Sequence, residues 1–127
     1  MNKKILIIED EADIRDLYCE FLKANKFDVV AVEDGQMGLD LAARGEWDLI
    51  LLDIMLPKVD GLELLRVIKS NGVASNIPVI LLTNLEKDEI LEKCLELGAK
   101  KYLVKSGITP QDLLEAVNSV LSDKTLA

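Results

Sequence analysis

Leu49-Ile50-Leu51-Leu52-Asp53 is the stretch of sequence that decides the fold, an apolar run that ends directly on an acid. Strands that are apolar at every position, instead of alternating with polar residues, are typical of parallel sheets covered on both faces. Similar short runs recur at residues 5–8, 29–32 and 79–82, with a weaker one at 102–104. The chain therefore carries five candidate strands of a parallel sheet.

Amphipathic segments separate these runs. Apolar residues at i, i+3 and i+4 spacing predict helices with one buried face, and they form four stripes: Ile14, Leu17, Tyr18, Phe21 and Leu22; Leu62, Leu65 and Ile68; Ile90, Leu91, Cys94 and Leu95; Leu113, Leu114, Val117, Val120 and Leu121. A further helix is predicted over residues 36–44, and residues 70–76 read as a polar loop. Gly45 and Gly98 lie where helices should end, and Pro110 lies where one should begin. The alternation predicts a doubly wound, three-layer α/β fold with helices on both sheet faces.

The composition is that of one ordered domain. The chain has 127 residues, of which 50% are hydrophobic and 30% charged, enough for a single core. Fifteen Lys and Arg against 23 Asp and Glu give a net charge of −8, which argues against binding nucleic acid or an anionic membrane. The apolar runs are too short for a signal peptide or a spanning helix, and two cysteines make no disulfide framework. We expect a cytoplasmic domain over residues 1–122 with a short tail at 123–127.

Acids and two other polar residues follow the apolar runs. Glu9 and Asp10 come after the first run, Asp53 after the third, Thr83 after the fourth and Lys105 after the fifth. Ligands of open parallel sheets bind outside the carboxyl ends of the strands, so these side chains should share one rim. Mg²⁺ would relieve the repulsion of the three carboxylates, and with the ammonium it would bring the formal charge of the site to zero. Asp53 could then attack a phosphoryl group as a nucleophile.

Each of these residues also has an ordinary structural explanation. Asp10 fits the N-cap of the first helix and Asp53 fits a loop acid. Thr83 is a common turn residue after a strand, and Lys105 is commonly a solvated charge. The joint placement at one rim favours the functional interpretation. The absence of histidine from the sequence excludes Ser-His-Asp and Cys-His catalysis.

Four motifs, taken together, resemble the receiver domain of two-component response regulators over essentially the whole chain. They are Ile5-Leu6-Ile7-Ile8-Glu9-Asp10-Glu11, Asp48–Pro57 with Asp60-Gly61, Pro78-Val79-Ile80-Leu81-Leu82-Thr83, and Gly98–Lys105. The resemblance implies a five-stranded sheet of order 2-1-3-4-5. It also implies a phosphoryl group taken from the phosphohistidine of a sensor histidine kinase or phosphotransfer protein.

The resemblance assigns a role to each matching position of the acid cluster. Asp53 corresponds to the phosphoacceptor. Glu9 and Asp10 correspond, with Asp53, to the acids of the Mg²⁺ site, and the backbone carbonyl of Met55 corresponds to a further metal ligand. Such a domain is no enzyme beyond assisting its own phosphoryl transfer and dephosphorylation.

The resemblance also implies how a signal would leave the domain. Thr83 and Lys105 correspond to residues that contact the phosphoryl oxygens, and Tyr102 falls at an aromatic switch position coupled to Thr83. We expect output to a downstream protein target or effector domain, with the chain a monomer or a weak phosphorylation-dependent dimer. Receivers that form DNA-binding dimers commonly use interlocking acidic and basic side chains on the face that includes the last helix. Residues 111–120 contain no Lys or Arg, so that set of ion pairs is not expected here. The start and end of the chain favour a stand-alone protein.

The sequence departs from the family pattern at several positions. Ser106 follows Lys105 where the family usually has proline, and a cis bond before a non-proline residue costs about 3–4 kcal/mol, so we predict a trans bond. Asn84 is larger than usual and would narrow access to Asp53 or donate a hydrogen bond to the phosphoryl group. Met55 and Leu85 occupy the two positions that influence hydrolysis of the aspartyl phosphate in the family, and neither side chain orients an attacking water well, so we predict a long-lived phosphoryl state.

Three alternative functions remain to be compared. One is a degenerate receiver that binds partners without phosphorylation. Another is an aspartate-nucleophile phosphohydrolase, but such enzymes need an acid two residues after the nucleophile, where this chain has Met55. The third is a flavin mononucleotide carrier, whose phosphate loop the acids at residues 9–13 would repel.

Overall fold

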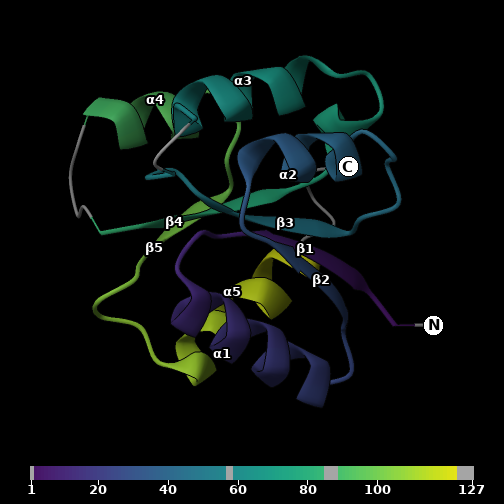
Figure 1. Cartoon of the computed structure of the whole chain (residues 1–127), viewed down its shortest axis with the longest axis vertical. Helices are drawn as coiled ribbons and strands as arrows, with labels where there is room; N and C mark the ends of the chain where they lie inside the picture. The colour runs from purple at the N-terminus through teal and green to yellow at the C-terminus, as the bar shows by residue number, and fades with distance from the viewer. Residues whose placement is uncertain (1, 57–58, 85–88, 123–127) are drawn as a thin grey trace.

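The structure is a computed structural model that describes residues 2–56, 59–84 and 89–122 of the chain. Strands and helices alternate in the order β1 (Lys4–Ile8), α1 (Ala12–Ala24), β2 (Asp28–Val32), α2 (Gly35–Ala42), β3 (Leu49–Asp53), α3 (Gly61–Ser70), a short 3-10 helix η1 (Ala74–Asn76), β4 (Val79–Thr83), α4 (Glu89–Glu96), β5 (Lys101–Val104) and α5 (Pro110–Leu121). Figure 1 shows the sheet as a middle layer between α2, α3 and α4 on one side and α1 and α5 on the other. The three-layer prediction is confirmed.

The sheet has five parallel strands in the order β2-β1-β3-β4-β5, as the resemblance implied. The chain runs from β1 outward to β2 and then returns to β3 on the other side of β1. All strands point the same way, so their carboxyl ends lie at one edge of the sheet. The last residues of β1, β3, β4 and β5 there are Ile8, Asp53, Thr83 and Val104. The reversal of strand order at β1 and β3 lies at that edge, where doubly wound folds bind their ligands.

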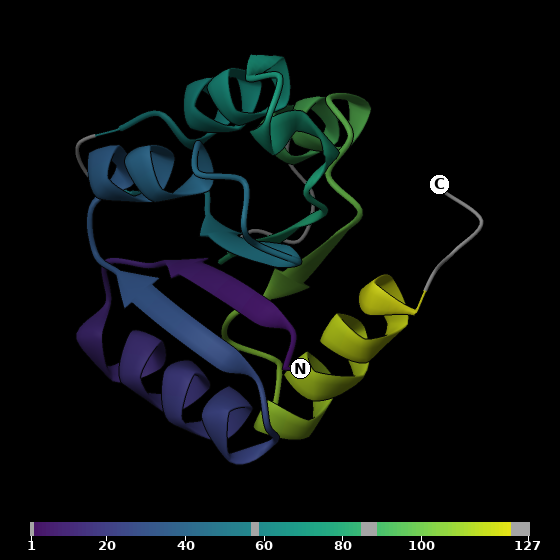
Figure 2. The ribbon, with the colours of Figure 1, turned by 90° about the vertical axis from the view of Figure 1, so that its right-hand side faces the viewer.

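Burial explains why the central strands are apolar at every position. Every residue of β3 and β4 is buried. One core lies between the sheet and α2, α3 and α4, and a second lies between the sheet and the pair α1 and α5 (Figure 2). The edge strands β2 and β5 are partly exposed, so the prediction of two covered faces applies fully only to the centre of the sheet.

The predicted helical stripes are wider than the buried faces. Tyr18 and Leu22 of α1 are buried, but Leu17 is 50% exposed. In α4, Ile90 and Leu95 are likewise exposed. Each of these helices packs on one side only, so residues at the margin of an apolar stripe remain in contact with water.

The helix ends follow the sequence signals closely. Gly45 and Gly98 have φ of 74° and 110°, a left-handed conformation that glycine adopts without strain. Pro110 is the first residue of α5, where Thr109 and Asp112 form a capping box. The predicted helix over residues 36–44 spans Gly35–Ala42. The predicted loop at residues 70–76 contains η1, where the Asn71 side chain accepts two backbone N–H bonds.

Trp47 and the two cysteines are packed into the protein to different degrees. Trp47 is buried, and its indole N–H donates to the Leu41 carbonyl at 2.7 Å. Cys94 is buried and Cys19 is half-buried, both as free thiols.

No helix in the part of the chain that the structure describes is long and apolar enough to cross a membrane. The predicted tail at 123–127 lies outside the described residues.

Candidate functional site

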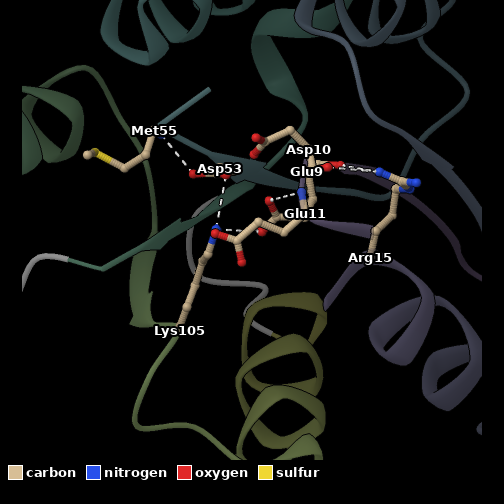
Figure 3. A network of polar contacts seen from close by, with 7 residues as sticks. All are labelled: Glu9, Asp10, Glu11, Arg15, Asp53, Met55 and Lys105. Carbon is tan, nitrogen blue, oxygen red and sulfur yellow. Dashed lines mark hydrogen bonds and ion pairs between the residues drawn. The ribbon is translucent and has the colours of Figure 1, made fainter. Parts of the chain in front are cut away.

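Five predicted site residues lie at the carboxyl edge of the sheet, and Figure 3 draws all of them except Thr83. Glu9 and Asp10 follow β1, and Asp53 and Thr83 are the last residues of β3 and β4. Lys105 follows β5, and its backbone N–H donates to the Thr83 carbonyl at 2.7 Å, which extends the β4–β5 pairing by one step. Glu9, Asp53, Thr83 and Lys105 are all buried.

Asp53 is held through both of its carboxylate oxygens. The Met55 backbone N–H donates to Oδ1 at 2.7 Å, and Lys105 Nζ donates to Oδ2 at 3.0 Å. Only 1% of the residue is exposed. The orientation of the carboxylate is thus fixed by one backbone donor and one ammonium, two donors that favour its charged form.

Glu9 is fully buried and faces the same ammonium. Its Oε2 accepts the Glu11 backbone N–H at 3.1 Å, and its Oε1 lies 2.8 Å from Lys105 Nζ as an ion pair. The ion pair is not aligned as a hydrogen bond, so Oε1 is a buried oxygen without a hydrogen-bond partner. Such an oxygen is suited to a cation placed between the acids.

The pKa values of the two buried acids, Glu9 and Asp53, are shifted in opposite directions. Burial, followed by the neighbouring Asp53 carboxylate, raises the pKa of Glu9 to about 8, and Lys105 lowers it only in part. Burial also acts to raise the pKa of Asp53, but hydrogen bonds with Glu9, the Met55 N–H and Lys105 outweigh it and hold that pKa below its ordinary value. Burial lowers the pKa of Lys105, but the hydrogen bonds and charges of Glu9 and Asp53 raise it by more, so the pKa lies above its ordinary value. Together these shifts favour an ionised Asp53 and a protonated Glu9.

Asp10 is not the N-cap residue of α1. The N-cap of α1 is Glu11, and no side chain caps that helix end. By contrast, Asp34 and Asp60 accept backbone N–H bonds at the starts of α2 and α3. The half-buried Asp10 carboxylate is thus available for another partner, and the N-cap explanation for it is wrong.

The donor set fits a hard divalent cation. One carboxylate oxygen each from Glu9, Asp10 and Asp53 lie within 4.8 Å of one another. Oxygen ligands from a few acids, completed by water, are what Mg²⁺ prefers. Glu9 also has a buried oxygen, Oε1, that pairs with the Lys105 ammonium but accepts no hydrogen bond, so a cation could supply it with a further partner.

Other predicted positions are placed less tightly. The side chain of Met55 is exposed and points away from Asp53 in Figure 3, and the role of its carbonyl as a ligand stays a prediction. Tyr102 lies on β5 opposite Leu81 and is 38% exposed, so the residue lies at the surface, and its role as a switch stays a prediction. Asn84 is exposed, and Leu85 lies outside the described residues.

The predicted trans bond before Ser106 is confirmed. Among the described residues no peptide bond is cis, the Lys105–Ser106 bond included. Lys105 nevertheless reaches Asp53 and Glu9, so this loop presents the ammonium to both acids without proline.

Two residues of the pocket, Glu11 and Arg15, make contacts that the sequence did not predict. Glu11 Oε1 lies 3.5 Å from Lys105 Nζ, and Arg15 donates to the backbone carbonyls of Glu9 and Asp10. Glu11 stood directly beside the predicted acids and could have been included. Arg15 lies one helical turn into α1, and only its polar position among the apolar residues Ile14, Leu17 and Tyr18 hinted that it faces the loop.

Comparison with known proteins shows which family the chain matches. A family model described as "Response regulator receiver domain" matches residues 5–118. The phosphate regulon transcriptional regulatory protein PhoB of Klebsiella pneumoniae is 36% identical over 121 residues, which are 95% of this chain and 52% of that protein. The alkaline phosphatase synthesis transcriptional regulatory protein PhoP of Bacillus subtilis (strain 168) is 36% identical over 129 residues, 100% of this chain and 52% of its own length. The chain thus spans about half the length of these relatives.

Solved structures share the fold over nearly the whole chain. A CheY-like response regulator receiver domain from Methanospirillum hungatei JF-1 matches with a TM-score of 0.86 and 30% identity, covering 95% of this chain and 94% of that one. The receiver domain of a sensor histidine kinase from Pseudomonas aeruginosa PAO1 matches with a TM-score of 0.87 and 27% identity, covering 97% and 100%. That second structure holds a magnesium ion coordinated in its active site cleft.

Proposed function

Because the chain belongs to the response regulator receiver family, we propose that it accepts a phosphoryl group on Asp53 from the phosphohistidine of a sensor kinase or phosphotransfer protein, with Mg²⁺ as cofactor. The observation that carries this proposal is the convergence of Glu9, Asp10 and Asp53 within 4.8 Å, beside the Lys105 ammonium. The magnesium-bound receiver from Pseudomonas aeruginosa supports the choice of cation.

The proposed step is a displacement at phosphorus. An Asp53 carboxylate oxygen forms a bond to phosphorus while the bond from phosphorus to the donor nitrogen breaks, and its electron pair returns to the imidazole ring. The Met55 N–H holds Oδ1, which fixes the direction of the other oxygen. When bound, Mg²⁺ supplies positive charge for the phosphoryl oxygens.

Lys105 would follow the negative charge during transfer. Its ammonium lies 3.0 Å from Asp53 Oδ2 and 2.8 Å from Glu9 Oε1. When Asp53 becomes an acyl phosphate, that oxygen loses its full charge and the new phosphoryl oxygens gain it. A small movement of Nζ would then pair it with a phosphoryl oxygen, beside the buried Thr83.

The output of the domain belongs to the proposal as well. The chain covers about half of its curated relatives, which are transcriptional regulators. We expect phosphorylation to shift the domain between two conformations that a downstream protein or an effector domain distinguishes, with the chain a monomer or a weak phosphorylation-dependent dimer. We also expect it to act in the cytoplasm and to have no enzymatic activity beyond forming and losing its own acyl phosphate.

Intact mass spectrometry tests the proposal directly. The protein is incubated with a small acyl phosphate and Mg²⁺, and we expect the addition of one phosphoryl group. Asp53→Asn should abolish the addition, while Asp40→Asn, on the exposed face of α2, should keep it. Phosphorylation of Asp53→Asn would refute the assignment of the residue.

The same experiment separates the alternatives. A degenerate receiver would take up no phosphoryl group under any donor or Mg²⁺ concentration. A phosphohydrolase would consume the acyl phosphate over many turnovers, but the thioether of Met55 cannot supply the proton that such turnover needs. A flavin carrier would bind flavin mononucleotide, which the acids around Asp10 repel.

A further inference from the structure

Arg15 donates hydrogen bonds to the loop between β1 and α1, which carries Glu9 and Asp10. Its Nη1 lies 3.0 Å from the Glu9 carbonyl oxygen and 3.3 Å from the Asp10 carbonyl oxygen (Figure 3). Its side chain is only 18% exposed, and the same nitrogen lies 3.9 Å from Glu33 Oε2 after β2. One guanidinium therefore contacts two consecutive peptide units of the loop between β1 and α1.

The loop has a physical need for such a contact. Asp10 and Asp53 carry like charges and their carboxylates lie close together, so they repel each other and push the loop away from β3. The start of α1 supplies no side-chain cap that would anchor the loop from the other end. On the strand side, the Glu9 N–H donates to the Val32 carbonyl at 3.0 Å, which holds one peptide of this segment. The carbonyls of Glu9 and Asp10 are held by Arg15.

The contacts of Arg15 with this loop are to the main chain. Its two short contacts are to carbonyl oxygens, whereas Lys105 contacts the Glu9 and Asp53 carboxylates themselves. The two cations thus act differently, since Lys105 neutralises carboxylates and Arg15 fixes the backbone from which they extend. Partners of this kind, which orient metal ligands without touching the metal, commonly change affinity by about 10–100-fold when removed.

We infer that Arg15 is a positioning residue for the cation site, which holds Glu9 and Asp10 in place by clamping their carbonyl groups. The inference rests on the proposed function only in that the three acids bind Mg²⁺. Arg15 needs no contact with the phosphoryl group for this role. In its absence the loop relaxes away from Asp53, and Mg²⁺ must spend part of its binding free energy to restore it.

Calorimetric titration of the metal-free protein with Mg²⁺ tests the inference. Arg15→Ala should weaken binding at least 10-fold at a temperature where the variant is fully folded. Arg15→Lys keeps the charge but places it on a shorter side chain that does not carry the planar guanidinium whose Nη1 meets both carbonyls, so its Kd should lie between those of the parent and Arg15→Ala. Arg66→Ala, which removes an exposed arginine paired with Glu63, should leave the Kd unchanged.

Glu33→Gln completes the set of variants. It removes only the 3.9 Å ion pair with Arg15 and should bind Mg²⁺ as the parent does. The inference is overturned if Arg15→Ala binds Mg²⁺ within twofold of the parent, even if its unfolding midpoint falls, because Arg15 then serves stability alone.

The outcomes for the parent protein keep this inference distinct from the proposed function. If the parent binds no Mg²⁺ and takes up no phosphoryl group, the proposed function fails and the clamp has nothing to position. If the parent does both and Arg15→Ala binds Mg²⁺ equally well, only the clamp fails. Amide hydrogen exchange at Glu11 in the metal-free protein is a second readout, since its N–H bond to Glu9 should open more often in Arg15→Ala.

Discussion

Lys105 Nζ and Asp53 Oδ2 meet at 3.0 Å in a buried pocket, although the two residues are 52 positions apart in the sequence. The ammonium is shared, because Glu9 Oε1 lies 2.8 Å away on its other side. The side chains of all three are at most 2% exposed. One buried cation therefore stands between two buried acids, and the stability and the chemistry of the pocket depend on the same contact.

Removing that cation should destabilise the metal-free protein. Lys105→Met leaves the buried Asp53 carboxylate without its counter-charge, and breaking a buried pair in this way costs roughly 3 kcal/mol. Mg²⁺ supplies new positive charge, so it should recover more stability in the variant than in the parent. Urea unfolding with and without Mg²⁺ measures both effects.

Lys93→Met, on the exposed face of α4, is the matched control and should unfold as the parent does. A loss of less than about 1 kcal/mol in Lys105→Met, similar to that of a surface ion pair, would contradict the buried contact.

Mg²⁺ affinity should depend on pH through Glu9. Its pKa is raised from 4.5 to about 8, so below pH 8 the pocket holds a proton that the cation must displace. With one linked proton, the Kd should fall by up to about tenfold per pH unit as the pH rises toward 8, and it should level off above that value. Calorimetry at pH 7 in buffers of different ionisation enthalpy should detect proton release.

The stability of the metal-free protein should change in the opposite direction. Between pH 4.5 and about 8, Glu9 holds its proton in the folded chain and has lost it in the unfolded chain. The folded state then binds more protons, so the contribution of Glu9 to the free energy of unfolding falls as the pH rises through this range. Glu9→Gln should remove both dependences, and a variant that keeps the pH slope would assign it to another group.

The turn after Asp53 should not tolerate a side chain at Gly61. A Cβ there would overlap the Cα and carbonyl of Ile54, the residue directly after Asp53. Backbone atoms cannot move aside as a flexible side chain does, so Gly61→Ala should cost about 1–3 kcal/mol and should also weaken Mg²⁺ binding. Gly72→Ala is the control, because nothing lies within 4 Å of its added methyl group. Equal unfolding midpoints for the two variants would disprove the close approach.

The phosphoryl group should persist once it is formed. Met55 is exposed and points away from Asp53, and its thioether is a poor partner for an attacking water (Figure 3). We expect a half-life of minutes or longer, measured as loss of the added mass after the phosphodonor is removed. Met55→Gln offers an amide that can orient water, so it should shorten the half-life. Decay of the parent within seconds would contradict the prediction.

The sequence predicted the fold well because its signals are local. Continuous apolar runs such as Leu49–Leu52 determine strands buried on both faces, and Gly45, Gly98 and Pro110 mark helix ends through backbone conformation alone. The errors concern how far a helix faces the core. Leu17 belongs to the apolar stripe of α1, but its exposure depends on the neighbours that α1 meets, and periodicity does not carry that information.

The acids of the site were predictable for the same reason, since a residue after a parallel strand lies at the ligand edge by topology. The contacts among them were not. The sequence does not show that Glu9 Oε1 lacks a hydrogen-bond partner or that burial raises its pKa, because both depend on distances between separate loops. Arg15 was missed because its partners are main-chain carbonyls, which every residue has.

Tyr102 offers a test of whether the pocket communicates with the surface. Its ring is 38% exposed on β5, whereas the other tyrosine, Tyr18, is 3% exposed in the core. If Tyr102 acts as the aromatic switch that the family resemblance implies, phosphorylation at Asp53 should draw Thr83 toward the phosphoryl group and open space for the ring to turn inward. Nitration of Tyr102, located by peptide mass spectrometry, should therefore slow after treatment with acyl phosphate and Mg²⁺. Tyr18 should stay unreactive in both states and serves as the internal reference. Asp53→Asn should show no change on treatment, and a Tyr102 that reacts equally in phosphorylated and unphosphorylated parent protein would mean that the signal leaves the domain by another route.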